Sequence, residues 1–451
     1  MTTTEQLHSL FLSCGGRICT DSRSLVPGDL FWALKGENFD GNDFAVAALE
    51  QGAAAAVVDS DSAAASCGLD GIVPVSGGTL RSLWALAAYH REHTLHDGAR
   101  IPMLALTGTN GKTTTKELIR CVLATKFALC ATAGNLNNNI GVPLTVLGLR
   151  PEHDFALIEM GASHPGDIRE LVDIAHPDYG LITNVGRAHL LGFGSFEGVC
   201  RTKGEMYDYV SSVGGQAFVN ADNPTLMQMA RERGVNLIPY GASLACSQIL
   251  PTDADNPFLG LKLTLGGEEF TLRTSLVGSY NADNALAALA VGLYFGVPAD
   301  DAVRAISSYV SQNNRSQMLR TQRNTLIVDA YNANPSSMAA ALDNFAAMLS
   351  PSKIVCLGDM LELGVESQEE HQKVVRRVME LAPAEAVLVG DEFAAACTSL
   401  GIPSDGCPVK FSLFGHSSDA AQYVRSRAFA GCAVLVKGSR GTRMETVIPE
   451  L

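Results

Sequence analysis

The stretch that decides the fold is Leu104-Ala-Leu-Thr-Gly-Thr-Asn-Gly-Lys-Thr-Thr-Thr-Lys116. Residues 103–106 are apolar and predict a buried strand, and the apolar spacing that follows the stretch predicts a helix. Between the two, Gly108 and Gly111 allow a tight turn and a close approach of the backbone to a ligand. Strand, glycine-rich turn, Lys-Thr and helix is the order of a phosphate-binding loop, in which backbone N–H groups and the positive end of the helix surround the phosphates.

The side chains of this loop fit the same interpretation. Lys112 supplies a point charge for phosphates, and the Thr113 hydroxyl can ligate magnesium. The common form of the loop has about four residues between its glycines, whereas here only Thr109 and Asn110 separate them. The alternative, a plain strand–helix turn with an exposed lysine, is disfavoured by the context of the motif. The predicted nucleotide contacts are Thr107, Gly108, Thr109, Asn110, Gly111, Lys112, Thr113 and Thr114.

Length and composition limit the possible classes of protein. At roughly 100–200 residues per domain, 451 residues predict two to four domains, and 47% hydrophobic residues can fill large cores. The net charge of −14 argues against a general nucleic-acid binder. It does not exclude anionic substrates, because a local group of lysines and N–H groups can hold phosphate on an acidic protein.

Cysteine usage and hydropathy indicate the compartment. The eleven cysteines are an odd number and none are spaced as C-x-x-C, which predicts reduced thiols in a cytosol and neither a disulfide framework nor a zinc site. We expect no signal peptide, because the N-terminus lacks a basic region followed by a long apolar run. No apolar stretch approaches ~18 residues, so we expect no membrane span and a cytoplasmic protein.

The chain order predicts three α/β domains. Residues 1–98 form a small domain with strands at 30–34 and 53–58 and helices around residues 7–11 and 80–89. Its segment Asp21-Ser-Arg23, taken alone, is typical of a capped turn.

Residues 99–311 carry the phosphate loop, so they are expected to bind the nucleotide. A strand at 155–158 ends in Glu159, and a strand at 181–185 leads into Gly186-Arg-Ala-His189. The alternation over 261–272 around Gly266-Gly267 predicts a β-hairpin inserted on the sheet edge, and segment 278–284 is expected to cap the helix that follows. The asparagine-rich segment 132–143 is either a solvated loop or a binding loop.

Residues 312–451 predict a third domain of repeating strand–helix units. Short β-branched strands at 325–328, 354–357, 387–389 and 434–436 are typical of a buried parallel sheet. Polar residues follow each strand at the same end, so one face of this domain is expected to bind a ligand.

Three residues after strands of the second domain form a candidate cation site together with Thr113. Singly, a strand-end glutamate is usually a cap, a histidine a satisfied polar residue and a lysine a solvated charge. Here Glu159, His189 and Lys203 follow successive strands beside a phosphate loop, and the first two are ordinary ligands for hard cations.

On these motifs the chain resembles the Mur ligase family of ATP-dependent amide ligases. The short Thr-Gly-Thr-Asn-Gly-Lys-Thr loop is typical of the family, and the likeness covers the whole chain in the same domain order. The segments Asn135-Leu-Asn-Asn138 and Tyr331-Asn-Ala-Asn334 favour the branch that adds D-alanyl-D-alanine to UDP-N-acetylmuramoyl-tripeptide. The other matching segments are 188–195, 358–364 and 437–440.

The resemblance implies a three-domain α/β architecture: an N-terminal UDP-substrate domain (1–98), a central ATP-binding phosphate-loop domain with a mostly parallel sheet (99–311), and a C-terminal Rossmann-like domain (312–451) that holds the dipeptide and closes on ATP. It implies ATP and magnesium, a monomer without nucleic-acid partners, and a role in peptidoglycan synthesis, hence in cell-wall biogenesis, cell shape and division. The implied reaction proceeds through an acyl phosphate, which the dipeptide amine then attacks.

The resemblance also assigns roles to individual residues. Lys112 would hold the β- and γ-phosphates, Thr113 and Glu159 a first magnesium, and Glu159, His189 and a carbamylated Lys203 a second. An unmodified lysine is a cation at neutral pH and would repel a metal, whereas its carbamate is an anionic oxygen ligand.

The remaining roles concern nucleotide and substrate. The implied contacts are Asn284 with adenine, Arg315 with the γ-phosphate, Asp329 with ribose, Ser22, Arg23 and Lys35 with UDP, Asn135, Asn137, Asn138 and Ser163 with the muramoyl peptide, and Tyr331, Asn332 and Asn334 with the dipeptide. One departure is Asn139, which stands where some relatives have aspartate.

Other functions remain open at this point. Within the ligases they are the diamino-acid-adding member of the family and a folylpolyglutamate synthase. From a different class, a phosphate-loop ATPase switch would need neither His189 and Lys203 nor a substrate-gripping first domain. The third residue of the acceptor peptide, meso-diaminopimelate or L-lysine, is not determined by the sequence.

Overall fold

A computed structural model describes residues 2–251, 257–311, 317–402 and 407–451 of the chain. By their internal contacts these residues form two units. The first unit comprises Met1–Leu106, Phe127–Gly161 and Asp167–Gly180, and the second comprises Thr107–Lys126, Ala162–Gly166 and Leu181–Leu451.

The first unit begins with the predicted small α/β domain. Its four parallel strands lie in the order β1-β2-β3-β4, and they are β1 (Ile18–Cys19), β2 (Leu30–Trp32), β3 (Ala55–Asp59) and β4 (Ile72–Val75). Three helices accompany the sheet, α1 (Thr4–Ser13), α2 (Ala45–Glu50) and α3 (Thr79–His93). Alternate strand residues, Phe31 and Ala56 among them, form one core with Ala45 and Ala48 of α2. The indole of Trp32, on the other side of β2, donates to the Thr79 carbonyl at 2.8 Å.

The rest of the first unit belongs to the central sheet. Strand β9 (Phe155–Glu159) pairs in parallel with β7 (Met103–Thr107) and β8 (Leu129–Ala131), and every residue of β7 and β9 is buried, as predicted. Within this unit the three strands have the order β7-β9-β8. The other elements of this part are β5 (Leu95–His96), β6 (Ala99–Arg100), α5 (Gly141–Val146), α6 (Asp167–Ala175) and β10 (Tyr179–Ile182).

Strand β10 ends earlier than predicted, at Ile182 instead of residue 185. The Thr183 hydroxyl and the Asn184 side chain both donate to the carbonyl of Asn110, so this segment is bound to the phosphate loop.

In the second unit, helices surround the phosphate loop. Helix α4 (Lys112–Leu123) packs against α10 (Asn281–Tyr294) and α11 (Ala299–Ser308). Segment 278–284 does not cap α10 through a side chain; Asn281 and Asn284 instead lie inside its first turn. The remaining elements are α8 (Phe196–Ser212), β11 (Gln216–Asn220), α9 (Pro224–Glu232) and β12 (Asn236–Tyr240).

The predicted hairpin is present, but in a different place. Strands β14 (Phe258–Leu265) and β15 (Glu268–Val277) turn at Gly266 and Gly267, whose φ angles of 60° and 90° favour glycine. They form a separate three-stranded sheet with β13 (Gln248–Ile249), not an extension of the central sheet. The reason is that the backbone groups of β14 pair with β13 and β15, while β15 packs on α11.

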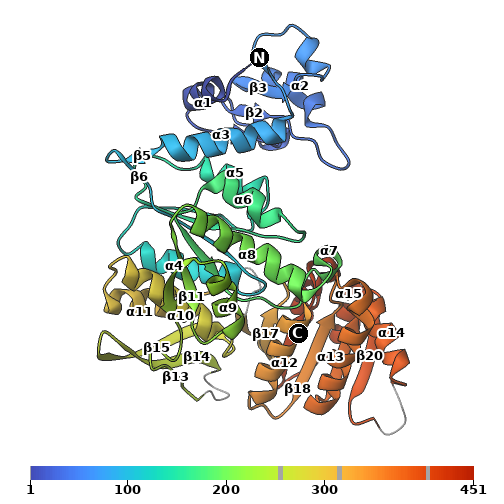
Figure 1. Ribbon diagram of the computed structural model, residues 1–451. Coiled ribbons are helices and arrows are strands. Elements are labelled where there is room, and N and C mark those ends of the chain that lie inside the picture. The colour runs from blue at the N-terminus through green and yellow to red at the C-terminus, as the bar shows by residue number, and fades with distance from the viewer. Residues whose placement is uncertain (1, 252–256, 312–316, 403–406) are drawn as a thin grey trace. The chain divides into compact units, whose positions relative to one another are not determined.

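The C-terminal part of the second unit is a layered α/β domain, drawn in orange to red in Figure 1. The strand order is β16-β17-β21-β18-β19-β20, all parallel except β16. The strands are β16 (Gln317–Arg320), β17 (Thr325–Asp329), β18 (Lys353–Gly358), β19 (Glu385–Val389), β20 (Lys410–Phe414) and β21 (Ala433–Lys437). The sequence predicted four of these six and missed β16 and β20, whose residues are less apolar.

Strand alternation gives this sheet two apolar faces. Ile327 and Leu435 pack under α12 (Pro335–Ala347), α13 (Ser367–Leu381) and α14 (Asp391–Ser399). Their neighbours Val328 and Val436 face α15 (Ser417–Arg427) and the 3-10 helix η6 (Met444–Glu450). The loops after β17, β18 and β21 leave the sheet at one edge, as predicted, because these three strands are parallel neighbours.

None of the helices in the described ranges is long and apolar enough to cross a membrane.

Candidate functional site

The phosphate loop is shaped by two glycines that other residues could not replace. Gly111 has a left-handed backbone and precedes α4, so Lys112 opens that helix. A Cβ on Gly108 would lie 1.9 Å from Oγ1 of Thr183, and one on Gly111 would lie 2.6 Å from Oδ1 of Asn284. Both positions therefore require glycine because another segment packs directly against the loop.

The rest of the loop is held by hydrogen bonds through Asn110. Its N–H donates to Oδ1 of Asn184 at 2.9 Å, and its carbonyl accepts from the Thr183 hydroxyl at 2.7 Å. Its side-chain oxygen accepts from Nδ2 of Asn334 at 2.8 Å. The loop is thus held by hydrogen bonds to the segment after β10 and to the start of α12.

The positive charge of the loop is already in position. Nζ of Lys112 donates to the carbonyls of Gly108 at 2.8 Å and Thr109 at 3.1 Å. Asn284, predicted near adenine, accepts from the Thr115 hydroxyl at 2.9 Å, so it lies beside the loop. A lysine ammonium, the N-terminus of a 12-residue helix and two side-chain-free glycines form an arrangement that fits a polyphosphate.

Glu159 lies at the end of β9 in the first unit and is 1% exposed. Its carboxylate accepts from Nδ2 of Asn137 at 2.8 Å, and its N–H donates to the Thr132 hydroxyl at 3.0 Å. Asn137 was predicted to contact the muramoyl peptide; here its side chain orients the glutamate. Oδ1 of Asn138 accepts at 2.8 Å from the N–H of Gly141, the first residue of α5.

His189 directly precedes α7 (Leu190–Phe193) and has a left-handed backbone, with φ of 51°. Burial lowers the pKa of its imidazole, against the opposing effect of the Glu362 carboxylate, so the ring is neutral at neutral pH. Nδ1 of His189 is hydrogen-bonded to Oε2 of Glu362. Glu362 was not among the predicted site residues, although it lies in the segment 358–364, one of those that resemble the family.

Lys203 is buried within α8, only 2% exposed, with Nζ 5.6 Å from the ring centre of Phe193. Its neighbour Glu205 accepts from the Gly166 N–H at 3.0 Å. Ser163 lies close to α7, because a Cβ on Gly192 would lie 2.0 Å from the Ser163 carbonyl oxygen. The predicted site residues Ser163, His189 and Lys203 therefore all lie next to α7.

In the third domain the predicted residues lie at the ends of β17 and β21. Asp329 accepts from Nζ of Lys437, which also donates to the Asn332 carbonyl at 3.1 Å. The Arg440 guanidinium lies 5.2 Å from the centre of the Tyr331 ring. Lys437 lies in the matching run 437–440 but was not among the predicted site residues; it is 1% exposed and pairs with Asp329, the predicted ribose contact.

Asn334, predicted near the dipeptide, has a structural role in addition. Its side chain accepts from the Ser337 N–H at 2.9 Å and forms a capping box at the start of α12. Its other side-chain atom contacts Asn110, so both polar groups of this side chain are engaged.

The candidate UDP residues lie on the surface of the first domain. Asp21 caps the 3-10 helix η1 (Ser22–Ser24), which confirms the capped turn. Arg23 bonds the Asp21 carboxylate through two nitrogens, at 2.9 and 2.7 Å, and these bonds lower the Asp21 pKa to about 2. Lys35 pairs with Asp59, with an N–O distance of 3.0 Å.

Two further observations concern ligands. Within the described part of the chain, no three His, Cys, Asp or Glu side chains are grouped so that they could hold a metal ion. Arg315 lies outside the described residues.

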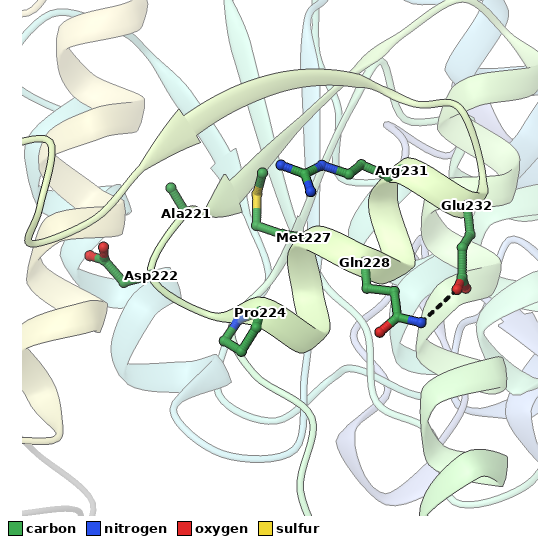
Figure 2. A pocket seen from close by; sticks show the side chains of 7 residues that line it. All are labelled: Ala221, Asp222, Pro224, Met227, Gln228, Arg231 and Glu232. Carbon is green, nitrogen blue, oxygen red and sulfur yellow. Dashed lines mark hydrogen bonds between the residues drawn. The ribbon is translucent and has the colours of Figure 1, made fainter.

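A separate pocket of about 550 Å³ opens beside α9, as Figure 2 shows. Its lining contains none of the predicted site residues and includes the hydrogen bond from Gln228 to Glu232 at 2.8 Å. The lining residues are Ala221, Asp222, Pro224, Met227, Gln228, Arg231 and Glu232.

Comparison with protein families and curated relatives decides the family. Residues 17–78 match the model of the Mur ligase family catalytic domain, 106–292 the Mur ligase middle domain, and 314–440 the Mur ligase glutamate ligase domain. The UDP-N-acetylmuramoyl-tripeptide–D-alanyl-D-alanine ligase of Escherichia coli is 35% identical, over 96% of this chain and 93% of the relative. The chain belongs to the Mur ligase family. The Bacillus subtilis ligase of the same name is 33% identical over 96% of this chain and 92% of its own.

Solved structures agree with this Mur ligase assignment. A crystal structure of MurF from Acinetobacter baumannii has a TM-score of 0.82 at 31% identity and covers 96% of this chain and 93% of its own. MurF from Thermotoga maritima in complex with ADP also scores 0.82, at 27% identity, and covers 96% of each chain. A folylpolyglutamate synthase of Mycobacterium tuberculosis scores 0.62 at 16% identity over 82% of this chain and 93% of its own, which shows a shared fold alone. The predicted three-domain Mur ligase architecture is thereby confirmed.

Proposed function

We propose that this protein is the ATP-dependent ligase that joins D-alanyl-D-alanine to UDP-N-acetylmuramoyl-tripeptide, giving UDP-N-acetylmuramoyl-pentapeptide, ADP and phosphate. The observation that carries the proposal is the likeness, over 96% of the chain, to relatives that bear this activity in their names. The hydrogen bonds and glycine packing that shape the phosphate loop support it. The two other ligase functions are less favoured, since a diaminopimelate ligase and a folylpolyglutamate synthase are only 18% and 16% identical to this chain.

The chemistry explains why a phosphate loop is needed. A carboxylate is a poor electrophile because its leaving group would be oxide, so the substrate carboxylate first attacks the γ-phosphoryl group of ATP. The dipeptide amine then adds to the acyl carbon, and phosphate leaves with the oxygen that came from the carboxylate. Lys112 and the N-terminus of α4 offset the negative charge that gathers on the transferred group.

Magnesium fits the oxygen donors of the site. When bound, the ion would neutralise the phosphate oxygens and polarise the acyl group. The Thr113 hydroxyl and the Glu159 carboxylate would hold one ion, with His189 and a modified Lys203 beside a second. Mg²⁺ is often held by one or two carboxylates together with substrate phosphates and water.

Lys203 is the residue whose chemistry can be tested separately from turnover. A buried lysine as a neutral amine can add carbon dioxide and become a carbamate, which supplies oxygen ligands. With ¹³C-labelled bicarbonate, we expect one carbamate signal in the ¹³C NMR spectrum that is lost in Lys203→Ala and in Lys203→Arg. Both variants should remain folded and lose most activity; a fully active Lys203→Arg enzyme would refute the idea, because arginine keeps the cation and cannot form the carbamate.

The other assignments concern substrate contacts. We assign the UDP diphosphate to Ser22, Arg23 and Lys35. All three lie at the surface of the same small domain, and the two cations can form charge-assisted hydrogen bonds to phosphate. The muramoyl peptide would lie along Asn135, Asn137, Asn138 and Ser163, the dipeptide along Tyr331, Asn332 and Asn334, and ATP would extend from the phosphate loop toward Asn284, Arg315 and Asp329.

Several properties accompany this function as part of the same proposal. The protein would act in the cytoplasm as a monomer, in the pathway that builds peptidoglycan for cell shape and division. Its domains would have the boundaries 1–98, 99–311 and 312–451, and closure of the last on ATP would bring Arg315 to the γ-phosphate. Arg315→Ala should then lower turnover far more than it weakens binding of the UDP-peptide.

The deciding experiment measures ATP turnover and product together. We expect negligible ADP release with ATP alone or with either substrate alone, and stoichiometric ADP, phosphate and pentapeptide, identified by mass spectrometry, when both are present. Strong ATP hydrolysis without substrates and without pentapeptide would indicate a phosphate-loop switch. Supplying the UDP-tripeptide with either meso-diaminopimelate or L-lysine at its third position determines the acceptor, and replacing the dipeptide by single amino acids tests the two other ligase functions.

A further inference from the structure

Two strained residues from distant parts of the sequence contact each other. His189 and Glu362 both have left-handed backbones, with φ of 51° and 65°, and neither is glycine. Such conformations persist only where surrounding structure enforces them, and they cluster at functional sites. Here the two strained residues are joined by the hydrogen bond between Nδ1 of His189 and the Glu362 carboxylate.

This bond lies within a larger contact, which we call the clasp, between residues 187–193 and 361–366. The Leu191 N–H donates to the Glu362 carbonyl at 3.2 Å, and the Leu191 side chain lies against Gly364. Nearby, the Arg187 guanidinium pairs with the Glu366 carboxylate at 2.7 Å. The clasp therefore combines the His189–Glu362 bond with a backbone hydrogen bond, an apolar contact and an ion pair, and of these four contacts only the first involves the imidazole.

Two further hydrogen bonds hold the backbone of the loop that carries Glu362. The Met360 N–H donates to Nε2 of the fully buried His371, whose Nδ1–H donates to the Ser367 carbonyl at 2.8 Å. The Leu361 N–H donates to the Ser439 hydroxyl at 3.0 Å. The backbone before Glu362 is thus held at two successive residues, which sets the direction of the glutamate side chain.

We infer that Glu362 is a positioning residue for His189. A carboxylate accepts hydrogen bonds only, so Nδ1 of the ring must carry the proton, and the lone pair of Nε2 is then left for a ligand. The inference rests on the proposed function, in which His189 is a metal ligand. Because the carboxylate comes from the C-terminal domain, the imidazole takes this tautomer and orientation when the clasp is formed.

The test compares two carboxylates of the same clasp. Spectra of ¹⁵N-histidine-labelled protein, recorded without metal at mildly alkaline pH where imidazoles are neutral, report the tautomer of each ring, and His189→Asn identifies the signal. We expect His189 to carry its proton on Nδ1 in the wild type and in the control Glu366→Ala, and to lose this preference in Glu362→Ala. Glu362→Gln, which keeps an acceptor oxygen, should preserve it.

Activity should follow the tautomer. Loss of an outer-shell partner typically costs 10–100-fold, so we expect Glu362→Ala to lower kcat about 10–100-fold with little change in the KM for UDP-tripeptide, and Glu362→Gln to recover much of it. A wild-type ring protonated on Nε2, or a tautomer unchanged in Glu362→Ala, would overturn the inference. So would equal kcat losses in Glu362→Ala and Glu366→Ala, which would make Glu362 a clasp contact only. A wild type that forms no pentapeptide would instead refute the proposed function, a result that is read independently of the tautomer.

Discussion

The phosphate loop and the turn at residues 21–24 are both expected to hold phosphates, yet they are built in different ways. In the phosphate loop, Asn110 bonds the side chains of Thr183, Asn184 and Asn334. Another segment packs directly against each of the two loop glycines. In the turn, the Arg23 guanidinium bonds the carboxylate of Asp21, two residues earlier in the same turn, and the Arg23 side chain is 87% exposed. The loop is pre-organised for chemistry, whereas the turn offers an accessible charge to a ligand.

This difference predicts different kinetic consequences. Pre-organised charge acts where charge develops in the transition state, and its loss lowers kcat. An accessible charge that contacts a distant part of the substrate contributes equally to the ground state and the transition state, so its loss raises KM. The variants of Lys112 and Arg23 below test that division, and those of His90 and Asn334 test the stability of the structure around the turn and the loop; they are given in order of decreasing expected effect.

The largest effect should come from Lys112→Ala. Removing one positioned charge donor should lower kcat roughly 10²–10³-fold while the KM for UDP-tripeptide changes little. Steady-state kinetics with Lys126→Ala as the control isolates the position, because Lys126 lies past the other end of α4 and bonds the Phe295 and Gly296 carbonyls. A Lys112→Ala enzyme that keeps a tenth of the wild-type kcat would contradict the assignment.

The domain that carries the turn should be sensitive to acid through His90. Its ring is buried and bonds His8 and the Leu149 carbonyl at 3.0 Å each, and burial lowers its pKa from 6.5 to about 4. Between pH 6.5 and about pH 4, His90 is protonated in the unfolded chain but stays neutral in the folded chain. The free energy of unfolding therefore falls as the pH falls from 6.5 toward 4, by about 3 kcal/mol at most.

Urea unfolding at several pH values checks this expectation. His90→Gln should flatten the dependence in that range, whereas His93→Gln, a neighbouring exposed histidine, should preserve it. Equal stability at pH 7 and about pH 5 would show that His90 is not held neutral by the fold.

Arg23→Ala should act on binding alone. We expect the KM for UDP-tripeptide to rise roughly tenfold, as for loss of one charge-assisted hydrogen bond, with kcat and thermal stability unchanged. The control is Arg17→Ala in the same domain, which removes the 2.8 Å bond to Asp29 and should lower the melting temperature without raising KM. If Arg23→Ala lowered kcat instead, the assignment of kcat effects to the phosphate loop and KM effects to the turn would be wrong.

The smallest effect separates the two contacts of Asn334. Asn334→Ala removes both the cap of α12 and the bond to Asn110, and should lower the free energy of unfolding by about 1–2 kcal/mol. Asn334→Ser keeps a capping oxygen but is too short to reach Asn110, so it should recover about half of that loss. Equal stabilities of the two variants, measured by urea unfolding, would mean that the cap contributes little.

The same comparison shows what a sequence can predict. The phosphate loop was predictable because strand, glycine spacing, Lys-Thr and helix are contiguous, and the buried parallel strands were predictable from their unbroken apolar runs. The partners of the loop were not, since Thr183, Asn184 and Asn334 are brought to Asn110 only by tertiary packing.

Pairs formed across long sequence distances were missed for the same reason. Lys437 meets Asp329 because β17 and β21 are neighbours in the sheet, and Glu362 meets His189 through the clasp. Nothing in local spacing encodes either pair. Strands β16 and β20 were missed because edge strands carry fewer apolar residues than the central ones.

The most direct test of the account follows the oxygen of the substrate carboxylate. If UDP-tripeptide is labelled with ¹⁸O in both oxygens of the carboxylate that receives the dipeptide, the acyl-phosphate route transfers one labelled oxygen to phosphate and leaves the other in the new amide. Mass spectrometry of the products should therefore find one ¹⁸O in each inorganic phosphate and one in each pentapeptide. Unlabelled phosphate formed together with pentapeptide would contradict the acyl-phosphate mechanism, and unlabelled phosphate without pentapeptide would contradict the ligase function itself.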